Sequence, residues 1–325
     1  MTTMTTMTRR RMIGASATAL AFAALPGHAR TAPLSVVATT GMIADAARNV
    51  GGDLVTVQAL MGPGVDPHAY RQTRSDIVAL TRADAVLWHG LYLEAQLEEL
   101  LVDLSSRGKV TAVGETVPQD LLIAHEDYQG KFDPHVWMVP ALWAHVVTGV
   151  RDALSAAAPD HAAVFDANAQ DHLDQIARLG SYAREVLMTV PEPSRVLLSA
   201  HDAFGYFGRA YGFEVIGIQG ISTESEAGLN RIGTLVELLV TRDIRAVFVE
   251  TSVSDRNMRA LIEGAAARGH TVAIGGELFS DAMGPPDTYE GTYMGMIDHN
   301  ATTIASALGG TAPARGMDGR LSAGL

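Results

Sequence analysis

The chain has 325 residues, of which 47% are hydrophobic and 18% are charged, so it can bury a large core and is not a disordered chain. Its formal net charge is −12, and Lys and Arg form no long basic run beyond the N-terminus, which disfavours nucleic-acid binding. The absence of cysteine excludes a disulfide framework, a thiolate metal site and a cysteine nucleophile.

Residues 1–29 are predicted to be a secretory signal peptide. Arg9, Arg10 and Arg11 precede a short apolar stretch that is too short to span a membrane, and Ala29 is the expected last residue removed. The arginines favour the twin-arginine route for proteins exported folded, with an ordinary Sec signal as the alternative. We expect a mature protein that is soluble in a periplasm, without a lipid-anchoring cysteine.

After the signal, β-rich apolar runs alternate with helical patterns, which predicts parallel sheets covered by helices. The expected strands lie at 34–40, 54–61, 84–90, 109–114, 195–200, 213–220, 244–250 and 270–279. Between 158 and 190, apolar residues recur at helical spacing, which predicts one long helix that ends before Pro191. A last helix is expected at roughly 289–308. The predicted class is α/β, with two lobes (30–157 and 191–325), each a mainly parallel sheet wrapped by helices, bridged by one long rigid helix, 158–190.

The tripeptide Asp-Pro-His occurs twice, ending at His68 and at His135. Proline fixes φ and extends the residue before it, so each His leaves a stiff turn in a restricted direction. His68, His201 and Asp281 each follow an expected strand, and ligands of open α/β sheets bind outside the carboxyl ends of strands. Imidazole suits Zn²⁺, Mn²⁺ and similar ions, and a carboxylate completes the charge balance. These residues are therefore candidates for one metal site.

Several segments carry a family resemblance, among them "FDPHVWMVP", "SAHDAFGYFGRAYGFEVIGIQGISTESEA" and "EGTYMGMIDHNATTI". They resemble the TroA-like metal-binding subunits of bacterial zinc/manganese ABC importers, and the resemblance runs through the mature chain in the same order. It implies two α/β lobes bridged by one rigid helix, with one divalent metal ion, Zn²⁺ or Mn²⁺, bound between them as cargo. The implied ligands are His68 and His135 from the first lobe, and His201 and Asp281 from the second.

The choice of metal stays open at this point. Three imidazoles and one carboxylate favour zinc by intrinsic affinity, whereas a bidentate Asp281 would suit manganese. Zinc-specialised relatives often carry a long His- and acid-rich loop before the second histidine. Here that region is only "IAHEDYQGKFDPH", with His125 as its one candidate, which disfavours a dedicated high-affinity zinc scavenger.

The remaining polar candidates are interpreted without a metal. Asp66 or Asp133 could orient its own loop or a ring N–H, and Glu250 could line the cleft or anchor a loop. The other histidines are assigned to the surface or the core, and those at 161 and 172 are expected to be solvated on the long helix: His89, His125, His145, His161, His172, His270 and His299.

The leading hypothesis is an extracytoplasmic solute-binding protein that captures a divalent metal and delivers it to an ABC permease. It is not expected to be an enzyme, because four protein ligands close the coordination sphere. It is also expected to be a monomer. One alternative is a secreted zinc-dependent hydrolase with Asp281 as a base, although no HExxH helix or serine elbow is present. The other is a protein that binds an organic solute, with the histidines incidental.

Overall fold

The computed structural model describes residues 32–106, 108–125, 128–225 and 227–322, so the predicted signal peptide lies outside the described residues. Residues from Pro33 onward form one compact unit. Within the described residues, no helix combines the length and the apolar character that a membrane span requires.

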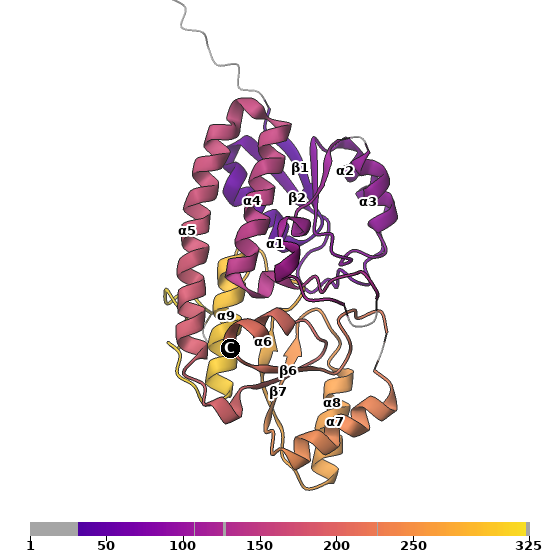
Figure 1. The fold of residues 1–325 in the computed structure, drawn as a ribbon, viewed down its shortest axis with the longest axis vertical. Coiled ribbons are helices and arrows are strands. Elements are labelled where there is room, and N and C mark those ends of the chain that lie inside the picture. The colour runs from indigo at the N-terminus through magenta and orange to yellow at the C-terminus, as the bar shows by residue number, and fades with distance from the viewer. Residues whose placement is uncertain (1–31, 107, 126–127, 226, 323–325) are drawn as a thin grey trace, which may run out of the picture. The chain divides into compact units, whose positions relative to one another are not determined.

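The first lobe is built on a four-stranded parallel sheet (Figure 1). Its strands, in the spatial order β2-β1-β3-β4, are β2 Val55–Ala59, β1 Leu34–Ala38, β3 Ala85–Trp88 and β4 Val110–Ala112. The helices of this lobe include α1 Gly41–Gly51, α2 Arg74–Arg82 and α3 Glu98–Ser105. All four residues of β3 are buried, as expected for a central strand that is covered on both faces.

The second lobe contains two pairs of parallel strands. Strand β5 Val196–Ser199 pairs with β6 Glu214–Gly217, and β7 Ala246–Glu250 pairs with β8 Ala273–Leu278. The β7–β8 ladder shifts register at a bulge near Gly276, and β5 lies beside β7. The helices α6 Gly205–Tyr211, α7 Leu229–Thr241 and α8 Arg256–Ala267 complete this lobe. The prediction of two α/β lobes with parallel strands is therefore confirmed.

Three long helices run beside the strands (Figure 1): α4 Pro140–Ala157, α5 Ala162–Leu187 and α9 Tyr293–Ala307. The helix expected at 158–190 is observed as a 3₁₀ turn, Pro159–His161, followed by the 26 residues of α5. Helix α5 packs against α1 and α4 of the first lobe and against α9, which contacts β8 of the second. The helix thus connects the lobes by packing as well as by sequence, while the lobe boundaries at 157 and 191 stay a prediction.

One expectation on this helix is wrong. His172 is buried, with 2% of its surface exposed, and neither ring nitrogen has a hydrogen-bond partner. The reason is its position: Ala169, His172 and Ile176 follow one another at spacings of three and four residues, so all three face the core. Burial accordingly lowers the pKa of His172 to about 4.

The hydrophobic core is continuous across the two lobes. One cluster includes Ile43 from α1, Trp143 from α4 and Leu179 from α5, together with Leu197 and Phe248 from strands of the second lobe. Because interiors are packed closely, a shared core limits how freely the lobes can move against each other. The loops that lie between the two lobes therefore rest on a core to which both lobes contribute.

Candidate metal centre

Four predicted residues meet between the lobes: His68, His135, His201 and Asp281 are all buried, and one ligand atom from each lies within 4.8 Å of the others. The Nε2 of His135 lies 3.3 Å from the Nε2 of His68 and 3.3 Å from the Nε2 of His201. The Asp281 carboxylate lies 3.4 Å from the Nε2 of His135 and 3.2 Å from the Nε2 of His201. A tetrahedral ion with nitrogen ligands at about 2.0–2.1 Å separates its ligands by about 3.3–3.4 Å. These four spacings match those between the ligands of a tetrahedral metal ion, and the two remaining pairs, from His68 to His201 and to Asp281, lie within 4.8 Å.

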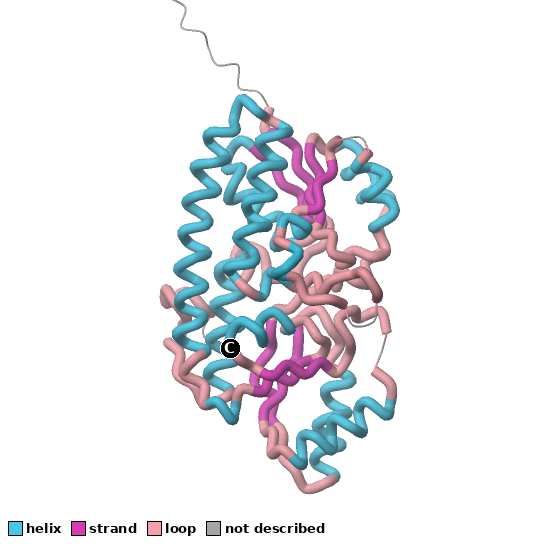
Figure 2. Tube along the Cα trace, viewed as in Figure 1, coloured by secondary structure: helices cyan, strands magenta, loops and turns pink. Residues whose placement is uncertain are grey.

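These residues come from loops that Figure 2 shows gathered between the strands of the two lobes. His68 lies in the loop after β2, His201 follows β5, and Asp281 follows β8. His135 is different, because it directly precedes a 3₁₀ turn, Val136–Met138, that leads into α4. The strand-end rule thus locates three of the four positions, and the repeated Asp-Pro-His phrase locates the fourth.

Two of the imidazoles are oriented by buried carboxylates. Asp133 accepts hydrogen bonds from the backbone N–H of His135, at 2.9 Å, and from its Nδ1, at 2.7 Å. Glu250 does the same for His201, at 3.0 Å from the backbone nitrogen and 2.5 Å from Nδ1. A carboxylate in this role accepts, so Nδ1 carries a proton, and Nε2, which faces the centre, is the nitrogen that gives up its proton when a metal ion binds. Sequence reasoning offered Asp66 or Asp133 for orienting a loop or a ring N–H without deciding between them, and it left Glu250 to line the cleft or anchor a loop.

The His68 loop is fixed differently. Asp66 accepts a hydrogen bond from the backbone N–H of His68, at 2.9 Å, and its other oxygen accepts one from the Thr223 hydroxyl, at 2.5 Å. Thr223 belongs to the second lobe, in the loop after β6. Asp66 therefore orients the backbone of its loop and ties that loop across the cleft, rather than holding the imidazole ring.

A second tie between the lobes passes through Trp137. Its indole N–H donates to the carbonyl of Ser280, at 2.7 Å, and its ring lies 5.1 Å from that of His135. Tyr293 donates its hydroxyl proton to the Trp137 carbonyl, at 2.9 Å. Since Ser280 precedes Asp281 in the chain, this buried indole links His135 in the first lobe to the loop that carries Asp281 in the second.

The electrostatics of the group favour one neutral imidazole and positive charge beside the carboxylates. Burial lowers the pKa of His68 to about 3, so this imidazole is neutral and its ring nitrogen is free to bind an ion. Burial opposes protonation of His135 as well, but the carboxylates of Asp133 and Asp281 outweigh it and raise the pKa of His135 to about 9. In the same way Asp281 and Glu250 overcome burial and raise the pKa of His201 well above its usual value. A divalent cation bound at the centre would supply the positive charge that stabilises the carboxylates of Asp133, Glu250 and Asp281.

Asp281 has the strongest requirement for such a partner. Burial opposes its ionisation, yet the neighbouring His201 and His135 hold the pKa of Asp281 well below its usual value. Neither carboxylate oxygen has an aligned hydrogen-bond donor, although two imidazole nitrogens lie close by. A buried carboxylate without hydrogen bonds is costly unless it binds a cation.

Within the described residues, no further histidine joins the group. His89 bonds through Nε2 to the carbonyl of Pro134, at 2.7 Å, and so supports the turn before His135. His270 and His299 bond in the same way to the carbonyls of Ile244 and Glu277. Their assignment to non-ligand roles agrees with this arrangement.

A buried group of three imidazoles and a carboxylate between two α/β lobes defines a class of protein: two-lobed solute-binding proteins of the metal-binding type. Residues 36–307 match the family model described as zinc-uptake complex component A, periplasmic (ZnuA), and the chain belongs to this family.

Individual relatives agree with this assignment. The chain is 47% identical over 283 residues to the manganese-binding lipoprotein MntA of Bacillus subtilis (strain 168), covering 87% of this chain and 92% of that protein. It is 45% identical over 273 residues to the zinc-binding protein TroA of Treponema pallidum (strain Nichols), covering 84% of this chain and 88% of that protein. The solved structure of periplasmic zinc-binding TroA from Treponema pallidum matches with a TM-score of 0.83 and 44% identity, covering 85% of this chain and 99% of that one. The Fe(III)-bound structure of YtgA from Chlamydia trachomatis matches with a TM-score of 0.77 and 26% identity, covering 86% and 99%.

Proposed function

We propose that this protein captures one divalent transition-metal ion, Zn²⁺ or Mn²⁺, as cargo between its lobes, and delivers it to the membrane permease of an ABC importer. The ligands are His68, His135, His201 and Asp281. The observation that carries the proposal is the convergence of these four buried side chains at the spacing of metal ligands. Family membership supports the same role.

Capture fits this site better than hydrolysis does. A zinc hydrolase needs three protein ligands and an open position for water, with a base nearby. Here Asp281 would have to be that base, but its carboxylate lies within 3.4 Å of the Nε2 of His135 and 3.2 Å of the Nε2 of His201. That is the position of a fourth ligand, which closes the coordination sphere and suits holding an ion without chemical change.

The donor set ranks the ions. Imidazole nitrogens bind Zn²⁺ more tightly than Mn²⁺, which is the weakest binder of the divalent first-row series. At equal free concentrations we therefore expect zinc to occupy the site, and manganese to do so where its free concentration is far higher. The protein acts outside the cytoplasm, as the predicted leader indicates, and presents its cargo to the permease as a single chain.

The test is a metal count on the mature chain after chelator stripping. The protein is equilibrated with buffered free Zn²⁺ and Mn²⁺, desalted, and weighed by native mass spectrometry. We expect one ion per chain in the wild type and in the control His161→Ala, and none in His68→Ala or His201→Ala after the same desalting. A wild-type chain that retains no ion, or equal loss in the control, would contradict the proposal.

A further inference from the structure

Helix α6 of the second lobe reaches across to the first-lobe backbone that leads to the second Asp-Pro-His phrase. Its residue Tyr206 donates the hydroxyl proton to the carbonyl of Asp133, at 2.7 Å, and accepts a hydrogen bond from the backbone N–H of Ile123, at 3.1 Å. Arg209, one turn further along α6, donates to the carbonyl of Leu121, and its guanidinium carbon lies 5.2 Å from the centre of the Tyr206 ring. The second lobe therefore holds this part of the first lobe by hydrogen bonds to its backbone.

The two residues that Tyr206 contacts are themselves paired. The backbone N–H of Asp133 donates to the carbonyl of Ile123, at 2.8 Å. The pairing continues in an antiparallel bridge between Ala124 and Phe132. We call these four residues the Asp133 ladder. Because the Tyr206 hydroxyl bonds to both runs of the ladder, it fixes the end from which the chain continues into the ligand turn.

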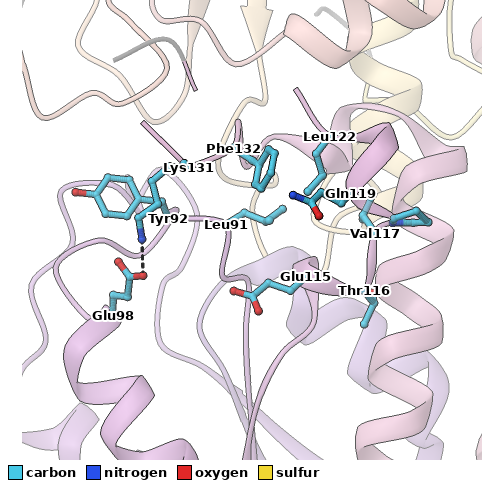
Figure 3. A pocket seen from close by; sticks show the side chains of 12 residues that line it. Leu91, Tyr92, Glu98, Glu115, Thr116, Val117, Gln119, Leu122, Lys131 and Phe132 are labelled. Atoms are coloured by element: carbon cyan, nitrogen blue, oxygen red, sulfur yellow. Dashed lines mark hydrogen bonds and ion pairs between the residues drawn. The ribbon is translucent and has the colours of Figure 1, made fainter. Parts of the chain in front are cut away.

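One side of the Asp133 ladder borders a cavity. Phe132 of the ladder and Lys131 beside it line this space of about 540 Å³, together with the loop after β3 at Leu91 (Figure 3). Lys131 forms an ion pair there with Glu98, at 2.8 Å, but a partly exposed pair of this kind stabilises little. Because a cavity supplies no packing contacts, the ladder depends more strongly on its bonds to α6.

Asp133 connects the ladder to the metal centre. Its Oδ1 accepts hydrogen bonds from the backbone N–H of His135, at 2.9 Å, and from the Nδ1 of that residue, at 2.7 Å. A Cβ on Gly205, the first residue of α6, would lie 3.0 Å from the Oδ2 of Asp133, so the backbone of α6 approaches the same carboxylate closely. Helix α6 thus contacts both the carbonyl and the carboxylate of the residue that orients His135.

On the basis of the proposed function, we propose that Tyr206 is a positioning residue of the metal centre, because its hydroxyl holds Asp133 in place and thereby sets the position of His135. His201 precedes α6 in the second lobe, and its own ring is held by Glu250. The Nε2 atoms of His135 and His201 lie 3.3 Å apart but belong to different lobes. Tyr206 attaches the lobe that carries one of them to the turn that carries the other.

The Tyr206 hydroxyl is suited to a lasting bond. Only 1% of the residue is exposed, and burial raises the pKa of Tyr206, so the hydroxyl keeps its proton and donates throughout the neutral pH range. The loss of one hydrogen bond between neutral groups changes an equilibrium by about 2- to 10-fold. The metal affinity should therefore respond measurably when this single hydroxyl is removed.

Tyr206→Phe removes the hydroxyl and keeps the ring. Tyr182→Phe is the matched control, because the Tyr182 hydroxyl bonds to that of Thr302, at 2.9 Å, between α5 and α9. The Kd for Zn²⁺ and the rate of Zn²⁺ loss to excess chelator are measured on the mature full-length chain. For Tyr206→Phe we expect a Kd about 3- to 10-fold above the wild type and a faster loss of zinc, whereas Tyr182→Phe should match the wild type in both.

A second background separates positioning from general stability. His135→Ala removes the ligand through which Tyr206 acts, and Zn²⁺ binding by the remaining ligands is measured at equilibrium at high free zinc. In that background Tyr206→Phe should leave the Kd unchanged. Equal weakening in both backgrounds would overturn the proposal, since Tyr206 would then support the fold as a whole. So would a lower unfolding temperature of Tyr206→Phe without any change in Kd.

The outcomes also separate this role from the proposed function. A wild-type chain that binds no ion would overturn the proposed function, whereas a wild-type chain that binds one ion as tightly as Tyr206→Phe would overturn the positioning role alone. If Tyr206→Phe does not fold, Gly205→Ala tests the same contact, because its Cβ would crowd the carboxylate of Asp133. It should weaken zinc binding only where His135 is present, and a wild-type Kd in Gly205→Ala would then overturn the proposal.

Discussion

Replacing Glu250 by glutamine tests whether a carboxylate behind the metal centre sets its affinity. Both oxygens of Glu250 accept from His201, one from the backbone N–H at 3.0 Å and one from Nδ1 at 2.5 Å. Glutamine keeps the shape but offers one accepting oxygen to the two N–H groups of His201, because its NH2 group can only donate. Either the backbone N–H loses its acceptor and the turn that holds His201 shifts, or Nδ1–H loses its acceptor and the ring is free to move its proton to Nε2, the atom that faces the centre.

The expected loss of metal affinity follows from the loss of this support for His201. Loss of a group that orients a metal-bound histidine typically weakens metal binding about 10- to 100-fold, or about 1.4–2.7 kcal/mol. At Asp133 a single oxygen, Oδ1, accepts from both N–H groups of His135, so Asp133→Ala is the variant that removes the same support, and it should weaken binding by a similar factor. Asp298→Asn is the control: it removes a buried carboxylate that binds Tyr289 and the backbone N–H of Met317, away from the centre.

The assay is competition for Zn²⁺ against a chromophoric chelator of known affinity, on folded protein at constant pH. Glu250→Gln should have a Kd at least about tenfold above the wild type. The Asp298→Asn control should lower the unfolding temperature without changing the Kd. A Glu250→Gln protein that binds within threefold of the wild type would refute the reasoning, because His201 would then need no fixed tautomer.

Two further predictions concern stability and coupling between the lobes. Burial raises the pKa of Asp45 from 3.8 to about 6, so the folded state prefers the protonated carboxyl, and the unfolding free energy should fall as pH rises from about 4 to about 6. In Asp45→Asn this fall should disappear, so relative to the wild type the unfolding free energy at pH 7 should gain at most about 3 kcal/mol over its value at pH 4. Urea unfolding of both proteins at pH 4 and pH 7 measures this difference. Wild type and Asp45→Asn losing the same unfolding free energy between these pH values would contradict the prediction. Trp137→Phe removes the hydrogen bond to Ser280 and should lower the unfolding free energy by about 1–3 kcal/mol and speed metal loss to a chelator. Metal loss at the wild-type rate would show that this bond does not couple the ligand loops.

Local signals in the sequence predicted much of this molecule. The Asp-Pro-His phrase marked stiff turns, and in the structure each Asp accepts the backbone N–H of the His two residues later, at 2.9 Å. Strand ends marked His201 and Asp281. The helical spacing that predicted α5 also placed His172 in the buried stripe, so its expected exposure was an error of interpretation rather than a missing signal.

Other features depend on contacts between distant segments. The bond between Trp137 and Ser280 joins residues 143 positions apart, and no local pattern specifies it. The backbone at Leu91 and Tyr92 has φ of 52° and 70°, a conformation that larger side chains rarely adopt, so sequence reasoning would not assign it. The cavity that includes Met61, Gly62 and Met283 among its lining residues is formed by loops from both lobes, and it could not be predicted without their conformations.

The most direct test of the central claim is X-ray absorption spectroscopy at the zinc edge of the protein loaded with one Zn²⁺. We expect three imidazole nitrogens and carboxylate oxygen at about 2.0–2.2 Å, with no sulfur ligand. His201→Ala, loaded at high zinc, should show one imidazole fewer. A shell of oxygens without imidazole scattering, or a wild-type spectrum that His201→Ala leaves unchanged, would contradict the assignment of these residues as the metal ligands.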